Sequence, residues 1–220
     1  MPAQTIETGD SRTQSFADWL QTNSRAVTIG AVVILLVGIS YWFYIRSGEI
    51  KAANAERGLS QAKQSLAAGN AALAQSDLQK VADRYSGTLP GAQAAMLLAQ
   101  LDYDQGKPAD GLKALEKYHT NRAAGPLLGS IWALTGDGQM ASGKPVDAAE
   151  SYKKAADATE LPGERAMFMA HAGRAYMAAG RNNDARDIWQ KLVDDPNAVA
   201  VQTEARVRLG ELEAKPAGKS

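Results

Sequence analysis

The hydrophobic positions of this chain follow two patterns, and the first is an unbroken apolar run over residues 26–45 that contains no charged residue. As a helix rising about 1.5 Å per residue, the run would be about 30 Å long, which matches the hydrocarbon core of a bilayer. Arg25 and Arg46 bracket the run, and its carboxyl end carries four aromatic residues, 41–44, where a headgroup layer would lie. A cleaved signal peptide has a shorter apolar run that is followed by small residues. We therefore predict an uncleaved transmembrane helix.

The second pattern is a repeat of 37 residues that follows this run. Small and large apolar residues keep fixed distances from a recurring glycine. The glycines are Gly69, Gly106, Gly143 and Gly180; the small residues seven positions earlier are Ala62, Ala99, Gly136 and Gly173; and the large apolar residues nine positions later are Leu78, Leu115, Tyr152 and Trp189. A fixed period of about 20–50 residues is typical of stacked repeat arrays, which present a binding surface to partners.

Each repeat unit predicts two helices that are joined at its glycine. A glycine at the end of the first helix can adopt the left-handed conformation that terminates helices. The second helices are expected at about 71–84, 109–119, 146–158 and 183–194, and residues 199–214 would form a further helix that covers the last unit. The predicted fold is therefore all-α, with one amino-terminal transmembrane helix, an α-solenoid of about four helix pairs and a carboxy-terminal capping helix.

These elements divide the chain into four segments. They are a cytoplasmic tail (1–25), a transmembrane helix (26–45), a repeat domain (46–214) and a disordered tail (215–220). Basic residues on the two flanks of the apolar run are nearly balanced, so they do not decide its orientation. A short tail before one span, with a large domain after it, is the usual layout of a signal anchor. We expect the repeat domain outside the cytoplasm; a cytoplasmic adaptor of inverted topology is the alternative.

The composition argues against several classes of function. The chain has 24 basic and 24 acidic residues, so it lacks the excess basic charge that nucleic acids attract. It has no cysteine, which excludes disulfides and thiolate metal sites. Its two histidines, His119 and His171, form no metal-binding motif, and neither a GxSxG motif nor a phosphate-binding glycine loop occurs. We expect no enzyme activity, no cofactor, no metal, and neither nucleic acid nor a small molecule as partner.

Two segments, 143–157 and 172–196, resemble tetratricopeptide repeats. The second segment contains the motif's small residue, tyrosine, glycine, alanine, bulky residue and closing proline, at Gly173, Tyr176, Gly180, Ala185, Trp189 and Pro196. The period of 37 exceeds the usual period of about 34. The first two units carry Ser65 and Asp102 in the slot of Tyr176, so we expect their first helices to be rotated or shifted from the standard register.

The front of the chain carries a more specific resemblance. Residues 15–44, SFADWLQTNSRAVTIGAVVILLVGISYWFY, followed by a degenerate repeat array, resemble the bacterial family of the ancillary Sec-translocon subunit. That family has one span in the inner membrane and a periplasmic tetratricopeptide-like domain. The resemblance implies a membrane-anchored scaffold whose partners are the export channel, periplasmic chaperones or exported clients. The alternative is an accessory subunit of another large membrane complex, whether respiratory, photosynthetic or of the cell envelope.

The resemblance to tetratricopeptide repeats also implies that the first helices line a concave, protein-binding face. Two series of residues recur there: Leu66, Tyr103, Met140 and Met177 in one position, and Lys63, Gln100, Asp137 and Arg174 one turn away. The apolar series would form an adaptable surface, because thioethers repack around varied partners. Alternatively, these apolar side chains pack against the second helix of their own unit. The eight residues are the candidate protein-binding site.

Overall fold

The computed structural model describes residues 24–214, and every regular element in that range is helical. The elements are α2 (Ser24–Ala67), α3 (Ala71–Arg84), α4 (Leu89–Asp104), α5 (Pro108–Glu116), the 3-10 helix η1 (Arg122–Leu127), α6 (Leu128–Ala141), α7 (Pro145–Asp157), α8 (Pro162–Ala178), α9 (Asn182–Asp194) and α10 (Val199–Ala214). The predicted all-α fold is confirmed. The predicted tails, 1–25 and 215–220, lie outside the described residues, apart from Ser24 and Arg25.

The first described helix, α2, is continuous over 44 residues and contains the predicted transmembrane segment. From Thr28 onward it is long and apolar enough to cross a membrane, with a mean hydropathy of 2.1 in its apolar window. The apolar side chains of this part are exposed, for example Ile34 at 74% and Phe43 at 68%. The helix continues past the apolar run, where Arg46 and Glu49 pair at 3.1 Å with helical i,i+3 spacing.

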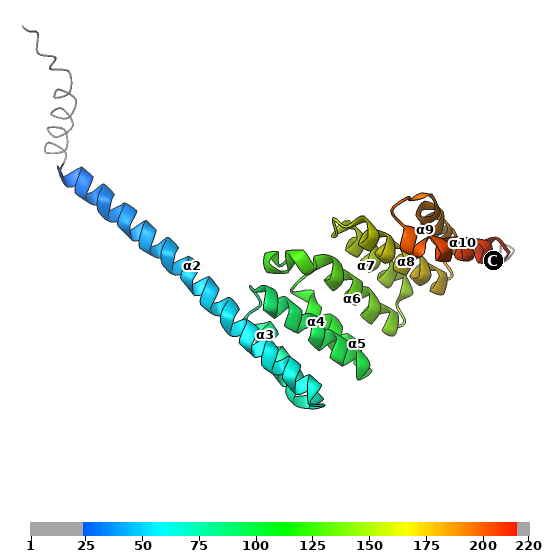
Figure 1. Ribbon diagram of the computed structural model, residues 1–220, viewed down its shortest axis with the longest axis horizontal. Helices are drawn as coiled ribbons and strands as arrows, with labels where there is room; N and C mark the ends of the chain where they lie inside the picture. The colour runs from blue at the N-terminus through cyan, green and yellow to red at the C-terminus, as the bar shows by residue number, and fades with distance from the viewer. Residues whose placement is uncertain (1–23, 215–220) are drawn as a thin grey trace, which may run out of the picture. The chain divides into compact units, whose positions relative to one another are not determined.

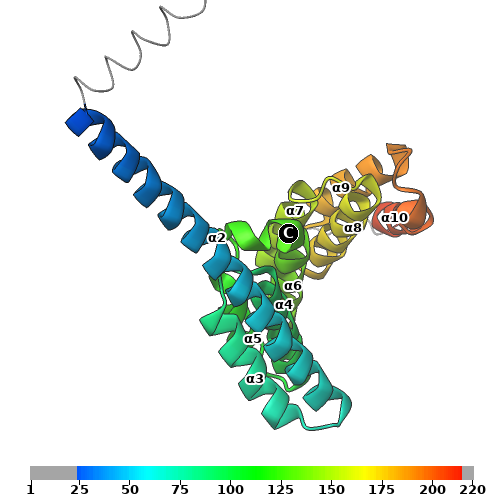
Figure 2. The same cartoon turned by 60° about the vertical axis from the view of Figure 1, so that its left-hand side comes forward.

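The chain divides into two compact units, residues 1–50 and 51–220, and the second unit contains the helix pairs. Within it, every α-helix from α3 to α9 contacts the next α-helix in the chain. Among the first helices and the cap, α4 also contacts α6, and α8 contacts α10. Figure 1 and Figure 2 show the pairs from α4 to α9, and then α10, following one another in chain order. This arrangement is the predicted solenoid.

Each first helix ends in the same turn around the recurring glycine. The φ angles of Gly69, Gly106, Gly143 and Gly180 are +74°, +72°, +70° and +71°. The Gly106 N–H donates to the Tyr103 carbonyl at 2.9 Å and the Lys107 N–H donates to the Asp102 carbonyl at 2.8 Å, and the same two bonds recur at the other three glycines. This Schellman motif satisfies carbonyls that the helix end would leave unpaired.

The Schellman turns also fix the register of the four units. Ser65 and Asp102 accept the same turn hydrogen bond that Tyr176 accepts in the last unit. All three residues therefore occupy one structural position relative to their glycine. The expectation that the first helices of the early units are rotated or shifted is wrong, because Ser65, Asp102 and Tyr176 are all buried, at 9%, 3% and 5% exposed, so the three helices turn the same face to the core.

The small and large residues of the repeat meet inside the helix pairs. A side-chain carbon added at Gly136 would lie 2.6 Å from the Tyr152 ring, and one added at Gly173 would lie 2.7 Å from the Trp189 ring. Only glycine permits this close approach of a helix backbone to an aromatic ring. Alanines dominate the rest of the two buried clusters, which lets the helices pack closely.

The helix α5 is shorter than predicted, since it ends at Glu116 rather than near residue 119. Tyr118 gives the physical reason. Its side chain is fully buried, and its hydroxyl lies 2.7 Å from the carbonyl of Ala82 on α3 and 3.0 Å from that of Gly91 on α4. The chain leaves the helical path where this phenol packs against α3 of the preceding pair and α4 of its own pair.

Candidate protein-binding surface

The eight predicted residues lie on the first helices of four successive units, and we call them the first-helix surface. They are Lys63 and Leu66 on α2, Gln100 and Tyr103 on α4, Asp137 and Met140 on α6, and Arg174 and Met177 on α8. The charged and polar members are exposed, whereas the apolar members are half-buried. Each apolar member stands three residues before a capping glycine, so the Schellman turn that ends the helix also fixes its position.

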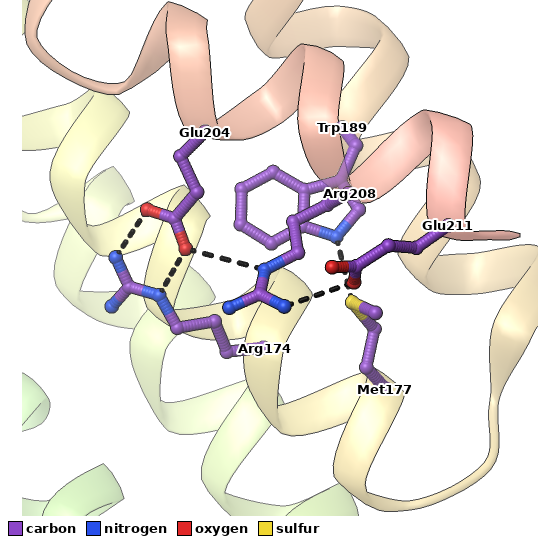
Figure 3. Close-up of polar contacts among 6 residues, drawn as sticks. All are labelled: Arg174, Met177, Trp189, Glu204, Arg208 and Glu211. Carbon is purple, nitrogen blue, oxygen red and sulfur yellow. Dashed lines mark hydrogen bonds and ion pairs between the residues drawn. The ribbon is translucent and has the colours of Figure 1, made fainter.

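The apolar members belong partly to the core. Met140 and Met177 pack on the buried cluster of the last two units, and Leu66 and Tyr103 pack on the cluster of the first two. Trp189 on α9 donates its indole N–H toward the Met177 sulfur at 3.3 Å (Figure 3). This contact with the second helix of the same pair is the packing role that the sequence left open. The part of each side chain that stays exposed is available to a partner.

Tyr103 connects two neighbouring first helices. Its hydroxyl donates to the Leu134 carbonyl of α6 at 3.1 Å. The phenol also fills the space that a side chain at Gly138 would occupy. Burial, together with the carboxylates of Asp137 and Asp102, raises the pKa of Tyr103. The hydroxyl therefore stays protonated, and remains a hydrogen-bond donor, throughout the physiological pH range.

Asp137 is held by a tyrosine of the second helix. The Tyr152 hydroxyl on α7 donates to Asp137 Oδ1 at 2.6 Å, and burial followed by this bond raises the pKa of Tyr152. The imidazole of His171 on α8 lies beside the Tyr152 ring, with the two centroids 5.1 Å apart. Burial and the charge of Arg174 lower the pKa of His171, so this imidazole is neutral at pH 7.

Arg174 connects α8 to the capping helix α10 through Glu204 (Figure 3). Its Nε and Nη2 donate to the two carboxylate oxygens of Glu204, each at 2.7 Å. Arg208 extends the series of charges along α10, with Nε 3.6 Å from Glu204 Oε1 and Nη1 2.9 Å from Glu211 Oε2. The bond from Arg174 lowers the pKa of Glu204. A bidentate pair of this kind fixes orientation as well as distance.

Sequence reasoning did not identify the α10 half of this charged group. Glu211 stands 37 residues after Arg174, and Arg208 stands 37 residues after His171. Counting the repeat onward through the capping helix would therefore have found Glu211, which continues the series of Arg174, but not Arg208, because His171 belongs to neither predicted series. Glu204 gave no such signal, since the position 37 residues earlier holds Met167.

The first two units contain the least engaged part of the first-helix surface. Within residues 24–214, the exposed side chains of Lys63 and Gln100 take part in no hydrogen bond or ion pair. The same part of the chain holds no group of three or more His, Cys, Asp or Glu residues that could bind a metal ion. The surface offers mixed charge, hydrogen-bonding groups and partly exposed apolar side chains, which suit contact with another protein.

Comparison with known proteins places this architecture in a family. The model of the tetratricopeptide repeat-like domain family matches residues 17–127 and 52–169, which together span more than half of the chain. The chain belongs to this family. Tetratricopeptide-like repeats are protein-interaction scaffolds, and stacked repeats use their extended surfaces for binding. No curated protein matches the sequence.

Solved structures confirm the fold of the tetratricopeptide-like repeats. The chain is similar to two crystal structures of nearly identical TPR-like repeats from a putative kinesin light chain of Podosopora anserina, one of them a form with a single substitution. The substituted form is 18% identical with a TM-score of 0.51, covering 74% of this chain and 94% of its own. The other is 17% identical with a TM-score of 0.53, covering 74% and 95%.

Proposed function

We propose that this chain is a single-pass protein of a bacterial inner membrane, with its amino terminus in the cytoplasm and a protein-binding repeat domain in the periplasm. We further propose that it is an ancillary subunit of the Sec translocon, in contact with periplasmic chaperones or exported clients. The proposal rests on the order of elements along the chain: one exposed apolar helix is followed by a scaffold of tetratricopeptide-like repeats.

The exposure of the apolar part of α2 supports the membrane assignment. Ile34, Leu35 and Leu36 are 59–74% exposed, and none of the apolar window is buried by the rest of the protein. Moving one such side chain from water into an apolar environment is favourable by about 1.5–3 kcal/mol, and lipid can supply that environment here. Tyr41 and Trp42, 66% and 65% exposed, stand at one end of the run, where aromatic residues anchor helices at the headgroup layer.

A membrane tether also suits the chemistry of the first-helix surface. Partly exposed apolar side chains and mixed charges give modest affinity for many partners rather than tight affinity for one. Anchoring the domain in the plane of the membrane raises its effective concentration beside other membrane proteins, so modest affinities suffice. This combination supports an ancillary role next to an export channel.

Reporter fusions test the orientation. Alkaline phosphatase, which is active only outside the cytoplasm, and green fluorescent protein, which fluoresces when fused on the cytoplasmic side, are each joined to the carboxyl terminus of the full chain. We expect phosphatase activity and a dark fluorescent protein. The opposite pair of results would remove the periplasmic proposal and leave the adaptor of inverted topology.

Site-specific photo-cross-linking tests the partner. Cross-linkers placed at Lys63 and Gln100, whose side chains are exposed, do not disturb the core. Lys191, exposed on α9, is the matched control position on a second helix. We expect cross-links from Lys63 and Gln100 to channel subunits, chaperones or varied exported chains, and few from Lys191. One fixed set of subunits from another complex would instead identify an accessory subunit, and equal labelling from Lys191 would exclude the first-helix surface.

A further inference from the structure

A cleft of about 840 Å³ lies among α3, α4 and α5, and none of the eight residues of the first-helix surface lines it. Its apolar wall consists of Ala82, Leu98 and Ala114. Its charged lining consists of Asp83, Asp102, Asp110 and Glu116, with Lys113 and Lys117. The cleft therefore involves the second helices of the first two units and is a separate surface from the candidate site described above.

Asp102 is a buried carboxylate in this cleft. Only 3% of the residue is exposed, and its Oδ1 accepts a hydrogen bond at 2.7 Å from the neutral amide of Gln75 on α3. Burial, and the negative charge of Asp110, raise the pKa of Asp102; the Gln75 bond and the more weakly acting Lys107 offset part of this effect. A buried charge whose hydrogen-bond partner is neutral is unfavourable for the fold. The carboxylate is thus poised to accept a positive partner.

Comparison with the last unit shows why the cleft is open. Two repeat periods, or 74 residues, after Asp102 and Ala114 stand Tyr176 and Ile188. Each has a larger side chain than the residue it corresponds to. Tyr176 is 5% exposed, its hydroxyl donates to Glu150 on α7, and the Arg181 guanidinium lies over its ring, 5.6 Å from the centroid. At the equivalent position of the last unit, therefore, the chain holds its own buried phenol with a cation over the ring. The second unit holds smaller side chains at both positions, and there they line a cleft.

We infer that this cleft binds an arginine or lysine side chain from an exposed segment of a partner protein. The lining has four carboxylates against two ammonium groups, and Lys117 is already paired with Asp83 at 2.5 Å. Three carboxylates and one ammonium group remain, which favours a cationic occupant. The stem of the incoming side chain lies along Ala82, Leu98 and Ala114, while its charged head donates to Asp102.

This inference depends on the repeats binding proteins, and not on the membrane, the orientation or the first-helix surface. The two sites share α4 but no lining residue, and the cross-linking position Lys63 lies on another helix, α2, so their tests separate. Substitutions in the cleft should leave cross-linking from Lys63 unchanged, and loss of the first-helix interaction should leave the cleft able to bind.

A fluorescence titration of the full chain in detergent tests the cleft. The protein has no cysteine, so Gln79→Cys at the rim can be labelled with bimane at one site. The same label at Lys153→Cys, the equivalent position 74 residues later, is the matched control. The probe is the blocked peptide Ac-Gly-Ser-Arg-Ser-Gly-NH2, and the same peptide with citrulline in place of arginine has the same shape without the charge.

We expect a saturable response to the arginine peptide from the label at the cleft and none from the control label. Binding should be at least ten-fold weaker for the citrulline peptide, and at least ten-fold weaker after Asp102→Asn, which removes the charge, or Asp102→Tyr, which fills the space. Asp187→Asn, on the exposed face of α9, removes the same charge elsewhere and should not change the affinity. Equal binding of citrulline, full affinity after Asp102→Asn, an equal response at residue 153, or no saturable response up to millimolar peptide would each overturn the inference.

Discussion

Gly173 of α8 lies against the indole ring of Trp189 of α9, so closely that a side-chain carbon on the glycine would stand 2.7 Å from Trp189 Cε2. Gly173 precedes the capping Gly180 by seven residues and Trp189 follows it by nine, so the helix turn brings the two together. The indole is fully buried, with its N–H directed at Met177. The recurring small and large residues of the sequence are thus the two sides of one interhelical contact.

This contact predicts that Gly173→Ala destabilises the repeat domain. The added methyl group has to displace the ring or separate the helices, and overpacking of this kind typically costs about 1–3 kcal/mol. Part of that cost is offset, because alanine in a helix interior is favoured over glycine by about 0.5–1 kcal/mol. We expect a net loss of about 1–2 kcal/mol in the free energy of unfolding, measured by urea denaturation followed by circular dichroism.

Gly210 is the control for this prediction. It stands 37 residues after Gly173, on α10, and no atom lies within 4 Å of the position of its added side-chain carbon. Gly210→Ala should therefore show only the helix preference and stabilise the domain by up to about 1 kcal/mol. The two changes in the free energy of unfolding need not be equal in size. A Gly173→Ala variant that is more stable than the wild type would show that the indole ring is not confined against Gly173.

A second prediction concerns the glycine turns. Gly143 has a φ of +70°, a conformation that costs an L-residue about 1–2 kcal/mol. Gly143→Ala should therefore lower the free energy of unfolding by about 1 kcal/mol, although nothing lies within 4 Å of the added carbon. Gly163→Ala, in the first turn of α8, also meets no atom and has no positive φ, so it should be neutral or stabilising. The same urea denaturation measures both, and equal behaviour would rule out the left-handed turn as the cause.

The sequence could predict features that depend on local residues, such as helix ends, but not contacts between helices that are distant in the chain. The turn at Gly143 is local, so its glycine and the period around it predict the helix pairs and their order. The early end of α5 depends on bonds from Tyr118 to two other helices, and no local signal announces such contacts. The tie from Arg174 to Glu204 is tertiary in the same way. Asp102 was visible as a departure from the motif, but only the packed helices show that its smaller side chain leaves a cleft.

The pair of Arg174 and Glu204 gives a prediction with a pH dependence. Both side chains are partly exposed, at 41% and 28%, so the bidentate pair should contribute about 0.5–1 kcal/mol. Arg174→Met should remove that amount at pH 7. Because Arg174 lowers the pKa of Glu204 below its ordinary 4.5, the contribution is complete above pH 4.5 and disappears as the pH falls through the lowered pKa.

Urea denaturation at pH 7 and pH 3 measures this effect as the difference between wild type and Arg174→Met. The difference should shrink at pH 3. Arg206→Met removes one exposed guanidinium from α10 and controls for the general change in charge. A loss of the same size at both pH values would mean that Arg174 acts through packing alone.

The last prediction has the opposite pH dependence and concerns Asp102. Its pKa is raised above the ordinary 3.8, so the folded protein binds a proton there more readily than the unfolded chain does. The buried charge therefore lowers the free energy of unfolding by its full amount above the raised pKa, and this destabilisation disappears as the pH falls through the raised pKa toward 3.8.

Asp102→Asn keeps the side-chain shape and a bond to Gln75 but carries no charge. We expect this variant to be more stable than the wild type at pH 7, with a difference that vanishes below pH 3.8; Asp147→Asn, an exposed carboxylate in the first turn of α7, should give no such gain. Stabilisation together with loss of the arginine peptide would identify Asp102 as a residue that serves binding at the expense of the fold, whereas a destabilised Asn variant would show that the carboxylate serves the fold instead.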